Sequence, residues 1–333
     1  IARLTKPQVT GLLAARQIEE GDITDQTTIG DSLIGYDGSW VADIPVLDLA
    51  THTSLLRSWL PLYLLASSFS PREIAKVIGD LPRPVGQKKV EYSDLNFIEL
   101  CQMIENGRPD VEYRLSVVNE LTLTRTCYNP LEHGFEKSEI AASEKGNGYE
   151  RRMCLELGYL SSDENNPKAT DRGSDLVGDR NSAFRDHQIW GEVHDGNAYF
   201  MGGVSGHAGL FSTAEEVFKI ALQFLPNYTT LLKPETCELF TTNFTKGLNE
   251  DRSFAFQLAS TKDSTAGTLM SPQSFGHLGF TGTSLWIDPI KERIFVLLTN
   301  RTHAHELPFV NINGVRRRFH DLSITELDKK ISN

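Results

Sequence analysis

The chain has 333 residues, with 33 Lys or Arg against 44 Asp or Glu, which gives a formal net charge of −11. Hydrophobic residues make up 39% and charged residues 23%, the balance of a globular protein and not of a disordered or fibrous one. The acidic surplus argues against a nucleic-acid partner, and the longest apolar run, residues 59–66, is too short for a membrane span of ~20 residues.

Residues 1–200 are predicted to form a mainly helical and loop region. A helix is expected over residues 5–20, because Pro7 suits a first helical turn and Gly21 suits a C-cap. Most of the apolar residues in this helix are expected to be buried.

Two further helices are expected in this first region. One covers residues 71–78 after the N-cap Ser70, and the other covers residues 94–105, where apolar residues recur at helical spacing. Residues 129–200 are polar and show little periodicity, which is typical of functional or mobile segments.

Residues 201–333 are predicted to form an α/β region. It opens with a glycine-rich segment, and a helix is expected over residues 214–224. Two strands, at residues 283–287 and 294–299, are predicted to form a hairpin through Asp288-Pro289. A closing helix is expected over residues 315–331, with Val315, Phe319, Leu322, Leu327 and Ile331 roughly on one face.

Helices and loops therefore dominate the first two thirds of the chain, and an antiparallel sheet with a terminal helix dominates the last third. This order predicts a single α+β unit over residues 1–333 and not an alternating βαβ fold.

Three separated motifs carry the chemistry of this sequence. They are Ile1-Ala2-Arg3-Leu4-Thr5-Lys6 at the start of a helix, Tyr92-Ser93-Asp94 before the second predicted amphipathic helix, and His277-Leu278-Gly279 just before the hairpin. Residues 48–54 and 193–198 add supporting similarity. In their order and spacing these motifs resemble the serine β-lactamase, penicillin-binding protein and esterase superfamily of bacteria, in its class C-like branch, over nearly the whole chain.

The resemblance implies a β-lactamase-like fold, in which an antiparallel sheet flanked by helices meets a mainly helical region at a cleft. It also implies acyl transfer through a serine ester, in which a Ser-x-x-Lys motif supplies the nucleophile. Lys6 would be the motif lysine, Tyr92 the proton-shuttling tyrosine and Asp94 the residue at the usual Asn position. His277, Leu278 and Gly279 would form the substrate-binding strand. The family needs no cofactor or metal.

Two departures from the family pattern lie in these motifs. The residue three positions before Lys6 is Arg3, and no lysine in the chain follows a serine by three positions. Leu278 replaces the threonine of the substrate-binding strand, so a second hydroxyl group is missing.

A guanidinium stays protonated at neutral pH and cannot attack a carbonyl carbon. We therefore expect a protein whose acyl-transfer activity is lost or severely impaired and which retains a cleft for a small-molecule or peptide ligand or for a partner. Arg3 and Lys6 would repel each other unless an anion or Asp94 lay between them, so the pair suits an anionic ligand.

Two other hypotheses stay open at this point. The chain could be a working hydrolase of an ester, amide or β-lactam that uses Thr5, Ser93 or a bound water as its nucleophile. It could also be a structural subunit, because the strand at 294–299 would present an apolar edge that an upstream segment or a partner chain has to cover.

Other signals favour structural interpretations. Asp94 could simply cap the helix that follows it, and the glycine segment 202–209 favours close backbone packing over phosphate binding. Ser205 lacks a nucleophile-elbow motif, and His303 and His305 are expected in a turn and not in a metal site. The segment Arg316-Arg317-Arg318 is expected on a solvated helix face. The four cysteines have no metal-ligand spacing.

Overall fold

The computed structural model describes residues 1–106, 111–160 and 183–332. Its α-helices are α1 (Leu12–Glu20), α2 (Ile29–Ser32), α3 (Val46–Ala50), α4 (Leu62–Leu65), α5 (Pro71–Gly79), α6 (Asp94–Glu105), α7 (Val111–Glu120), α8 (Gly148–Glu156), α9 (Gly196–Phe200), α10 (Ala214–Ala221) and α11 (Asn313–Ile331). The strands are β1 (Gln257–Leu258), β2 (Phe275–Leu278), β3 (Ser284–Asp288) and β4 (Arg293–Leu297). Shorter helical segments are η1 (Ala2–Leu4), η2 (Lys6–Gly11), η3 (Trp40–Asp43), η4 (Pro130–His133), η5 (Lys137–Glu139), η7 (Leu222–Phe224) and η8 (Pro234–Phe240).

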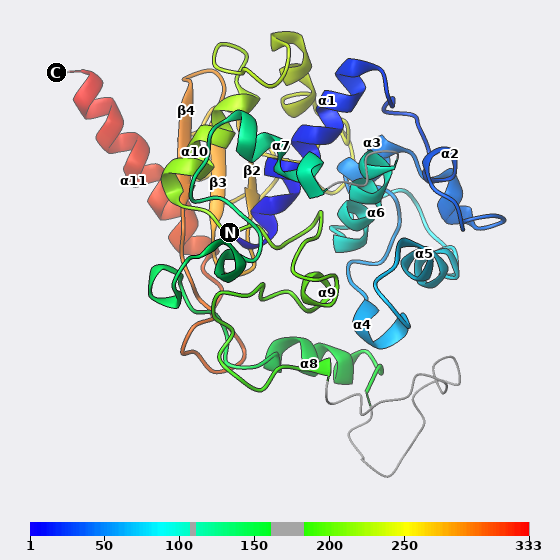
Figure 1. Ribbon diagram of the computed structural model, residues 1–333. Coiled ribbons are helices and arrows are strands. Elements are labelled where there is room, and N and C mark those ends of the chain that lie inside the picture. Colours follow the sequence, from blue (N-terminus) through cyan, green and yellow to red (C-terminus); the bar gives the residue numbers. More distant parts are fainter. Residues whose placement is uncertain (107–110, 161–182, 333) are drawn as a thin grey trace.

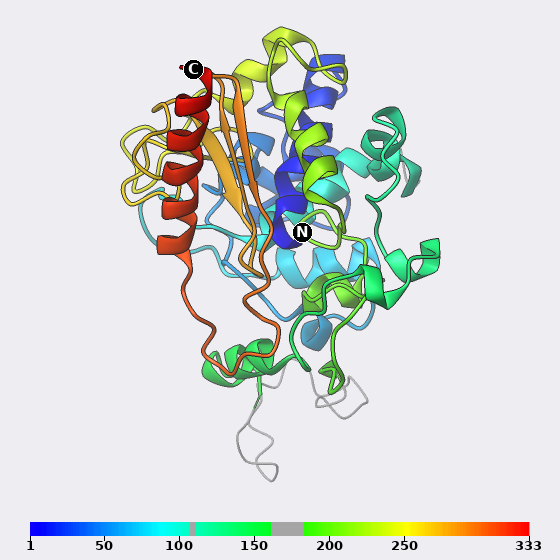
Figure 2. The ribbon, with the colours of Figure 1, turned by 90° about the vertical axis from the view of Figure 1, so that its left-hand side faces the viewer.

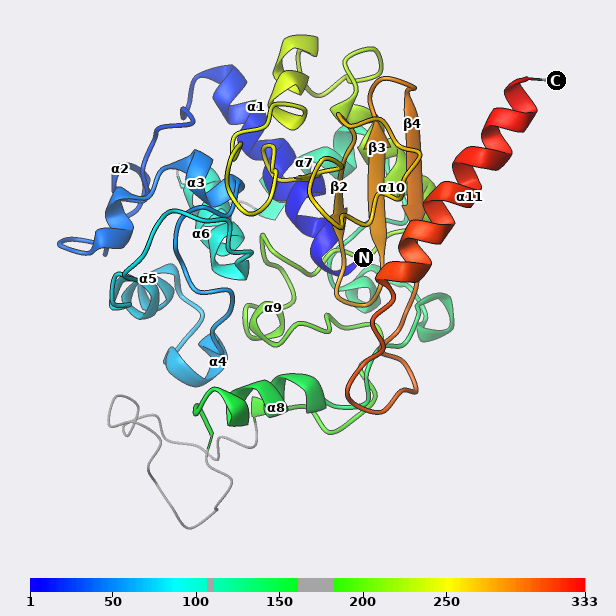
Figure 3. The ribbon, with the colours of Figure 1, turned by 180° about the vertical axis from the view of Figure 1, so that it is seen from behind.

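The four strands form one antiparallel sheet in the order β1-β2-β3-β4, with Gly276 opposite Trp286 and Trp286 opposite Phe295. Helix α11 covers one face of this sheet, and α1 and α10 lie against the other face (Figures 1 and 2). Helices α2 to α6 gather to the side of α1 that is away from the sheet, and α9 and α8 lie below α1 in Figure 3. The architecture is α+β, which confirms the predicted fold class.

The core between the sheet and α1 and α10 is rich in aromatic residues. Phe224, Phe240, Phe256 and Phe275 are fully buried, and the Phe256 ring centroid lies 4.9 Å from that of Phe275 and 5.0 Å from that of Phe224. This cluster joins the helical layer to β2. It therefore supports the segment that carries Arg3 and Lys6, since η1 packs against β2.

The predicted helix over residues 5–20 is not one regular α-helix. A 3-10 turn, η1, and a π-helical segment, η2, precede α1, and every residue of η2 is buried. The Gln8 amide donates to the Val217 carbonyl and the Thr10 hydroxyl donates to the Gly206 carbonyl. The backbone of η2 is therefore shaped by contacts with distant residues as well as by its local helix propensity.

The other predicted helices lie where the sequence places them. Helix α6 has the expected bounds, α5 begins after the N-cap Ser70, and the helix at 214–224 is α10 followed by the 3-10 turn η7. Helix α11 confirms the closing helix. Helices α7, α8 and α9 and the short strand β1 were not predicted.

The buried face of α11 differs from the prediction. Val315, Leu322 and Ile331 are exposed, whereas Arg316, His320 and Ile324 are buried. The expectation that Arg316 lies on a solvated face was therefore wrong. Its guanidinium donates hydrogen bonds to the carbonyl groups of Gly279, Gly282 and Thr283, which compensates the cost of its burial.

The hairpin of β3 and β4 is confirmed, and Asp288 stabilises its turn by accepting hydrogen bonds from the backbone of Ile290 and Lys291. Strand β4 pairs with β3 on one side, and within the described ranges no strand pairs with its outer edge. None of the described helices is long and apolar enough to cross a membrane.

Truncation of Phe256 to Ala is expected to lower the free energy of unfolding by about 3–5 kcal/mol, because it leaves a cavity in the aromatic core. Phe218→Ala on α10 is the matched control, since Phe218 is 41% exposed and its loss should cost less than about 1 kcal/mol. Urea denaturation of both variants measures the difference. Equal losses would contradict the assignment of Phe256 to the core.

Candidate functional site

One carboxylate, that of Asp94, joins two of the three predicted motifs. Arg3 Nη2 lies 2.6 Å from Asp94 Oδ2 and Arg3 Nε lies 2.9 Å from Oδ1, so the guanidinium binds the carboxylate through two nitrogens. Lys6 Nζ lies 2.6 Å from Asp94 Oδ1. The anion that was expected to separate Arg3 from Lys6 is therefore Asp94 itself.

Helix geometry brings this group together. Asp94 is the first residue of α6 and Ser93 is its N-cap residue, but neither side chain caps the helix. The carboxylate of Asp94 instead reaches the η1–η2 segment, where Arg3 and Lys6 lie one turn apart. The capping interpretation of Asp94 is thus wrong, because its oxygens are occupied by two cations 88 and 91 positions away.

The electrostatics of the group follow from its burial. Burial lowers the pKa of Lys6 to about 8, although Asp94 opposes the shift. Burial acts to raise the pKa of Asp94, but Arg3 and Lys6 outweigh it and hold that pKa well below its ordinary value. Asp94 also holds the pKa of Arg3 above its ordinary value in spite of burial. The carboxylate and the guanidinium are therefore charged across the physiological range.

Tyr92 lies beside this group. Lys6 Nζ is 4.8 Å from the centroid of its ring, and its hydroxyl group is buried with no hydrogen-bond partner among the described residues. Burial raises the pKa of Tyr92 above its ordinary value. Its hydroxyl is therefore neutral and is not engaged by Lys6 or Arg3.

The third motif lies on β2 and directly after it. His277 is buried, with its ring centroid 5.8 Å from that of Tyr92, and Leu278 ends the strand opposite Ser284. Gly279 follows, and its N–H donates to the carbonyl of Thr283. A side chain at Gly279 would collide with the Thr283 hydroxyl, at 1.8 Å, so this close turn requires glycine.

A cavity of about 510 Å³ opens next to these residues, within the usual range for a small-molecule site. Of the predicted residues, Arg3, Tyr92 and Asp94 line it, whereas Lys6, His277, Leu278 and Gly279 do not. Phe280 and Thr281, just after the third motif, form that part of the wall. Aromatic and aliphatic side chains make up much of the rest, among them Trp59, Phe135, Ile140, Tyr149, Met153, Ile189, Leu210 and Phe211.

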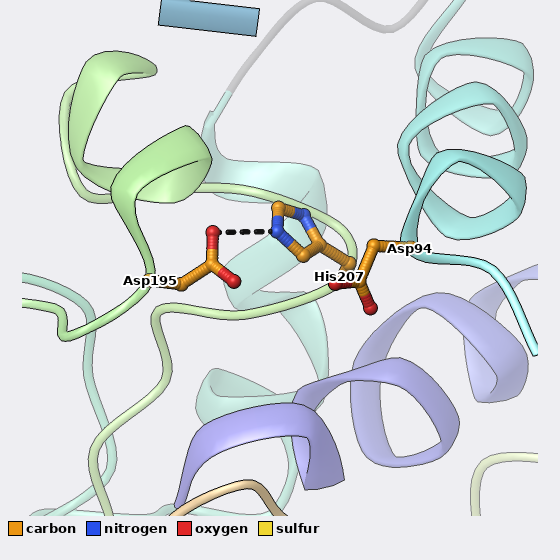
Figure 4. Close-up of side chains that lie close together, drawn as sticks. All are labelled: Asp94, Asp195 and His207. Carbon is orange, nitrogen blue, oxygen red and sulfur yellow. Dashed lines mark hydrogen bonds and ion pairs between the residues drawn. The ribbon is translucent and has the colours of Figure 1, made fainter. Parts of the chain in front are cut away.

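Asp195 and His207 complete the polar group, and sequence reasoning had given neither a role in the site. His207 Nε2 lies 2.9 Å from Asp195 Oδ1 (Figure 4). On the other side of the ring, His207 Nδ1 lies 2.7 Å from the Ser205 hydroxyl. Asp195 Oδ2 lies 3.9 Å from Arg3 Nη2. Burial acts to raise the pKa of Asp195, but His207 lowers it below its ordinary value, so Asp195 is a second anion near Arg3.

Asp94, Asp195 and His207 are, within the described part of the chain, the one group whose ligand atoms lie close enough to hold a metal ion. Arg3 and Lys6 already supply the positive charge next to Asp94, and His207 uses both ring nitrogens. The chemistry of the group is thus that of a salt-bridge network. His303 lies in a turn, as expected, with Nδ1 3.3 Å from the carbonyl oxygen of Ser143.

The alternative nucleophiles are both engaged elsewhere. The Thr5 hydroxyl donates to the carbonyl of Ala2 and accepts from the N–H of Leu210, and the Ser93 hydroxyl donates to the carbonyl of Arg57. Both residues are fully buried, and neither lines the cavity. The close packing expected of the glycine segment is present at Gly206, where a Cβ would lie 2.4 Å from the carbonyl oxygen of Phe97 on α6.

Comparison with known proteins agrees with the resemblance. The family model described as Beta-lactamase matches residues 2–315, so the chain belongs to this family. A protein of Escherichia coli strain K12 named "Putative D-alanyl-D-alanine carboxypeptidase" is 33% identical over 228 residues, which cover 66% of this chain and 46% of that protein. A Salmonella agona protein of the same name is 31% identical, with the same coverage. The chain thus spans about half the length of the curated relatives it matches.

Solved structures share the fold. A class C β-lactamase from Rhodobacter sphaeroides superposes with a TM-score of 0.63 at 14% identity, over 98% of this chain and 84% of that one. A β-lactamase/D-alanine carboxypeptidase from Pseudomonas syringae gives 0.62 at 12% identity, over 97% and 83%. At these identities the likeness shows the fold alone, and it confirms the predicted β-lactamase-like architecture.

Asp94→Asn is expected to lower the free energy of unfolding by about 3–5 kcal/mol, because it leaves two cations next to a neutral amide in a buried site. Asp328→Asn is the control: Asp328 pairs with Arg293 at 2.6 Å but is 49% exposed, so its loss should cost less than about 1 kcal/mol. Chemical denaturation measures both. A small effect at Asp94 would mean that the pairing does not stabilise the fold.

Lys6 should make stability rise with pH between about 8 and 10.5. The unfolded chain holds this proton up to the ordinary pKa of 10.5 and the folded chain only up to about 8, so the unfolded state binds more protons in that window. The unfolding free energy of the natural chain should therefore gain about 3 kcal/mol relative to Lys6→Met as pH rises through it. A constant difference between the two proteins would show that the pKa of Lys6 is ordinary.

Proposed function

We propose that this member of the Beta-lactamase family has lost acyl transfer through a serine ester and uses its cleft to bind a small-molecule or peptide ligand. One observation supports the loss above all others. Arg3 stands three positions before Lys6, where the family places its nucleophile, and its guanidinium is bound through two nitrogens to Asp94. A charged guanidinium has no lone pair to attack a carbonyl carbon.

The remaining machinery supports the same proposal. In the family mechanism the lysine and tyrosine exchange protons with the serine. Here Lys6 Nζ is bound to Asp94, and the Tyr92 hydroxyl has no hydrogen-bond partner within the described ranges. Both side chains still lie beside Arg3. They are therefore placed to act on a serine at this position, but they have no serine to act on.

The cavity supports a binding role. Its volume of about 510 Å³ and its aromatic walls suit a ligand with an apolar part, since removal of apolar surface from water drives such binding. Arg3 is 22% exposed on the cavity wall. Asp94 occupies its Nε and Nη2, which leaves Nη1 to donate to a carbonyl or carboxylate oxygen of the ligand.

Intact-mass spectrometry after incubation with a fluorophosphonate or a penicillin tests the proposal. The natural chain should gain no adduct. Arg3→Ser should gain one, because it restores a hydroxyl next to Lys6 and Tyr92. Arg16→Ser on α1, which removes two surface ion pairs, one with Glu20 and one with Glu120, is the matched control and should gain none.

Two results would count against the proposal. A stoichiometric adduct on the natural chain would show that another nucleophile is active, and peptide mapping would identify it. No binding of an apolar carboxylic acid such as phenylacetate to the natural chain in calorimetry, or binding that Arg3→Ala leaves unchanged, would argue against the ligand-binding role.

A further inference from the structure

His194 has a position in the cleft that the proposed function does not use. It lies in the 193–198 segment, directly before Asp195, and its side chain is 12% exposed and lines the cavity. Its ring stacks on that of Phe280, with centroids 5.4 Å apart and an angle of 22° between the planes. Phe280 also contacts Arg3, whose Cζ lies 5.3 Å from the ring centroid. His194 and Arg3 therefore share one wall of the cavity.

A buried carboxylate orients the imidazole of His194. Its Nε2 lies 2.7 Å from Glu144 Oε2, and the other oxygen of Glu144 accepts a hydrogen bond from the backbone N–H of Tyr149 at 2.9 Å. Since an ionised carboxylate only accepts hydrogen bonds, Nε2 carries the proton and Nδ1 has a free lone pair.

The second nitrogen of this ring is open. Nδ1 of His194 has no hydrogen-bond partner in the described part of the chain, and it is not among the buried atoms that lack one. It therefore faces space that water can reach. A histidine with one nitrogen fixed by a carboxylate and the other open to a ligand cavity has the geometry of a general base.

We propose that His194 activates water for direct hydrolysis of an ester bound in the cleft, without a covalent intermediate. His194 Nδ1 takes a proton from water while the water oxygen bonds to the ester carbonyl carbon. The carbon–oxygen bond to the alcohol then breaks, and the imidazolium returns the proton to the leaving alkoxide. Water and ester are consumed, and a carboxylic acid and an alcohol are released.

Glu144 stabilises the imidazolium that forms in this step, and the Arg3 guanidinium beside Phe280 stabilises negative charge on the carbonyl oxygen. The inference rests on the proposed loss of the covalent route, because an active serine would hydrolyse the same esters. Arg3 thereby has a second role, as the cation that stabilises negative charge on the ester carbonyl oxygen.

A second pair in the chain supplies a matched control. His187 Nε2 lies 2.6 Å from Glu192 Oε1, a similar pairing, but its side chain is 54% exposed and does not line the cavity. A loss of activity in His187→Gln would therefore reveal an unspecific contribution of surface histidines to ester hydrolysis.

The test is steady-state hydrolysis of p-nitrophenyl butyrate by the natural chain, His194→Gln, His194→Ala, Glu144→Gln and His187→Gln. Glu144→Gln should lower kcat, because it removes the carboxylate that orients His194. The natural chain should turn over without an initial burst and more slowly in D2O. His194→Gln should lower kcat about 100-fold, the usual scale of general-base catalysis, and His187→Gln should not change it. Added imidazole should restore part of the activity of His194→Ala, which a purely structural role would not permit.

The outcomes separate the two proposals. Turnover that His194→Gln leaves unchanged, or no turnover above the buffer rate, would overturn the role of His194 and leave the proposed loss of acyl transfer intact. An initial burst with an acyl adduct in the mass spectrum would overturn the proposed loss itself. Thermal melts verify that the variants are folded. If Glu144→Gln does not fold, the activity of His194→Gln and the imidazole rescue of His194→Ala still test the role of His194.

Discussion

The site depends on one buried carboxylate that serves two cations. Asp94 neutralises Arg3 and Lys6 together, and without it these like charges would lie one helical turn apart in a buried environment. Two charges that share one anion are held more firmly than exposed pairs, because water and salt do not screen them. The arrangement joins the N-terminal segment to α6 and thereby the sheet side of the molecule to its helical side.

This pairing explains how the fold accommodates an arginine three positions before Lys6. A long, charged side chain at a buried helix start would ordinarily destabilise the protein. Here Asp94 and the more distant Asp195 balance the charge, the Phe280 ring covers the guanidinium, and His207 fixes Asp195. Arg3 can therefore lie on the wall of the cavity as a charged group.

Local features of the fold could be predicted from the sequence, because they depend on residues close in the chain. The bounds of α6 follow from apolar spacing and the start of α5 from the cap Ser70, and the hairpin follows from two apolar runs around Asp288. The buried face of α11 could not be predicted, since Arg316 binds carbonyl groups of a loop more than 30 positions away. The π-helical segment η2 before α1 likewise could not be predicted, since it makes contacts with residues 206 and 217.

The site divides in the same way. Arg3, Lys6, Tyr92 and Asp94 were found because the family motifs contain them, and the structure brings them together. The sequence left open whether Asp94 caps α6 or belongs to the site, because its partners Lys6 and Arg3 lie 88 and 91 positions away. The roles of His194, Asp195 and His207 depend on pairs that no local spacing encodes, such as the contact between His194 and Glu144 across 50 positions.

A double-mutant cycle between Arg3 and Asp94 tests the central claim most directly. The free energy of unfolding is measured for the natural chain, Arg3→Ala, Asp94→Asn and the double variant. The account predicts that the two single losses do not add, with a coupling free energy of about 2–3 kcal/mol in favour of the natural pair. A coupling near zero, as for an exposed surface pair, would show that Arg3 is not held by Asp94 and would remove the physical basis for its place in the site.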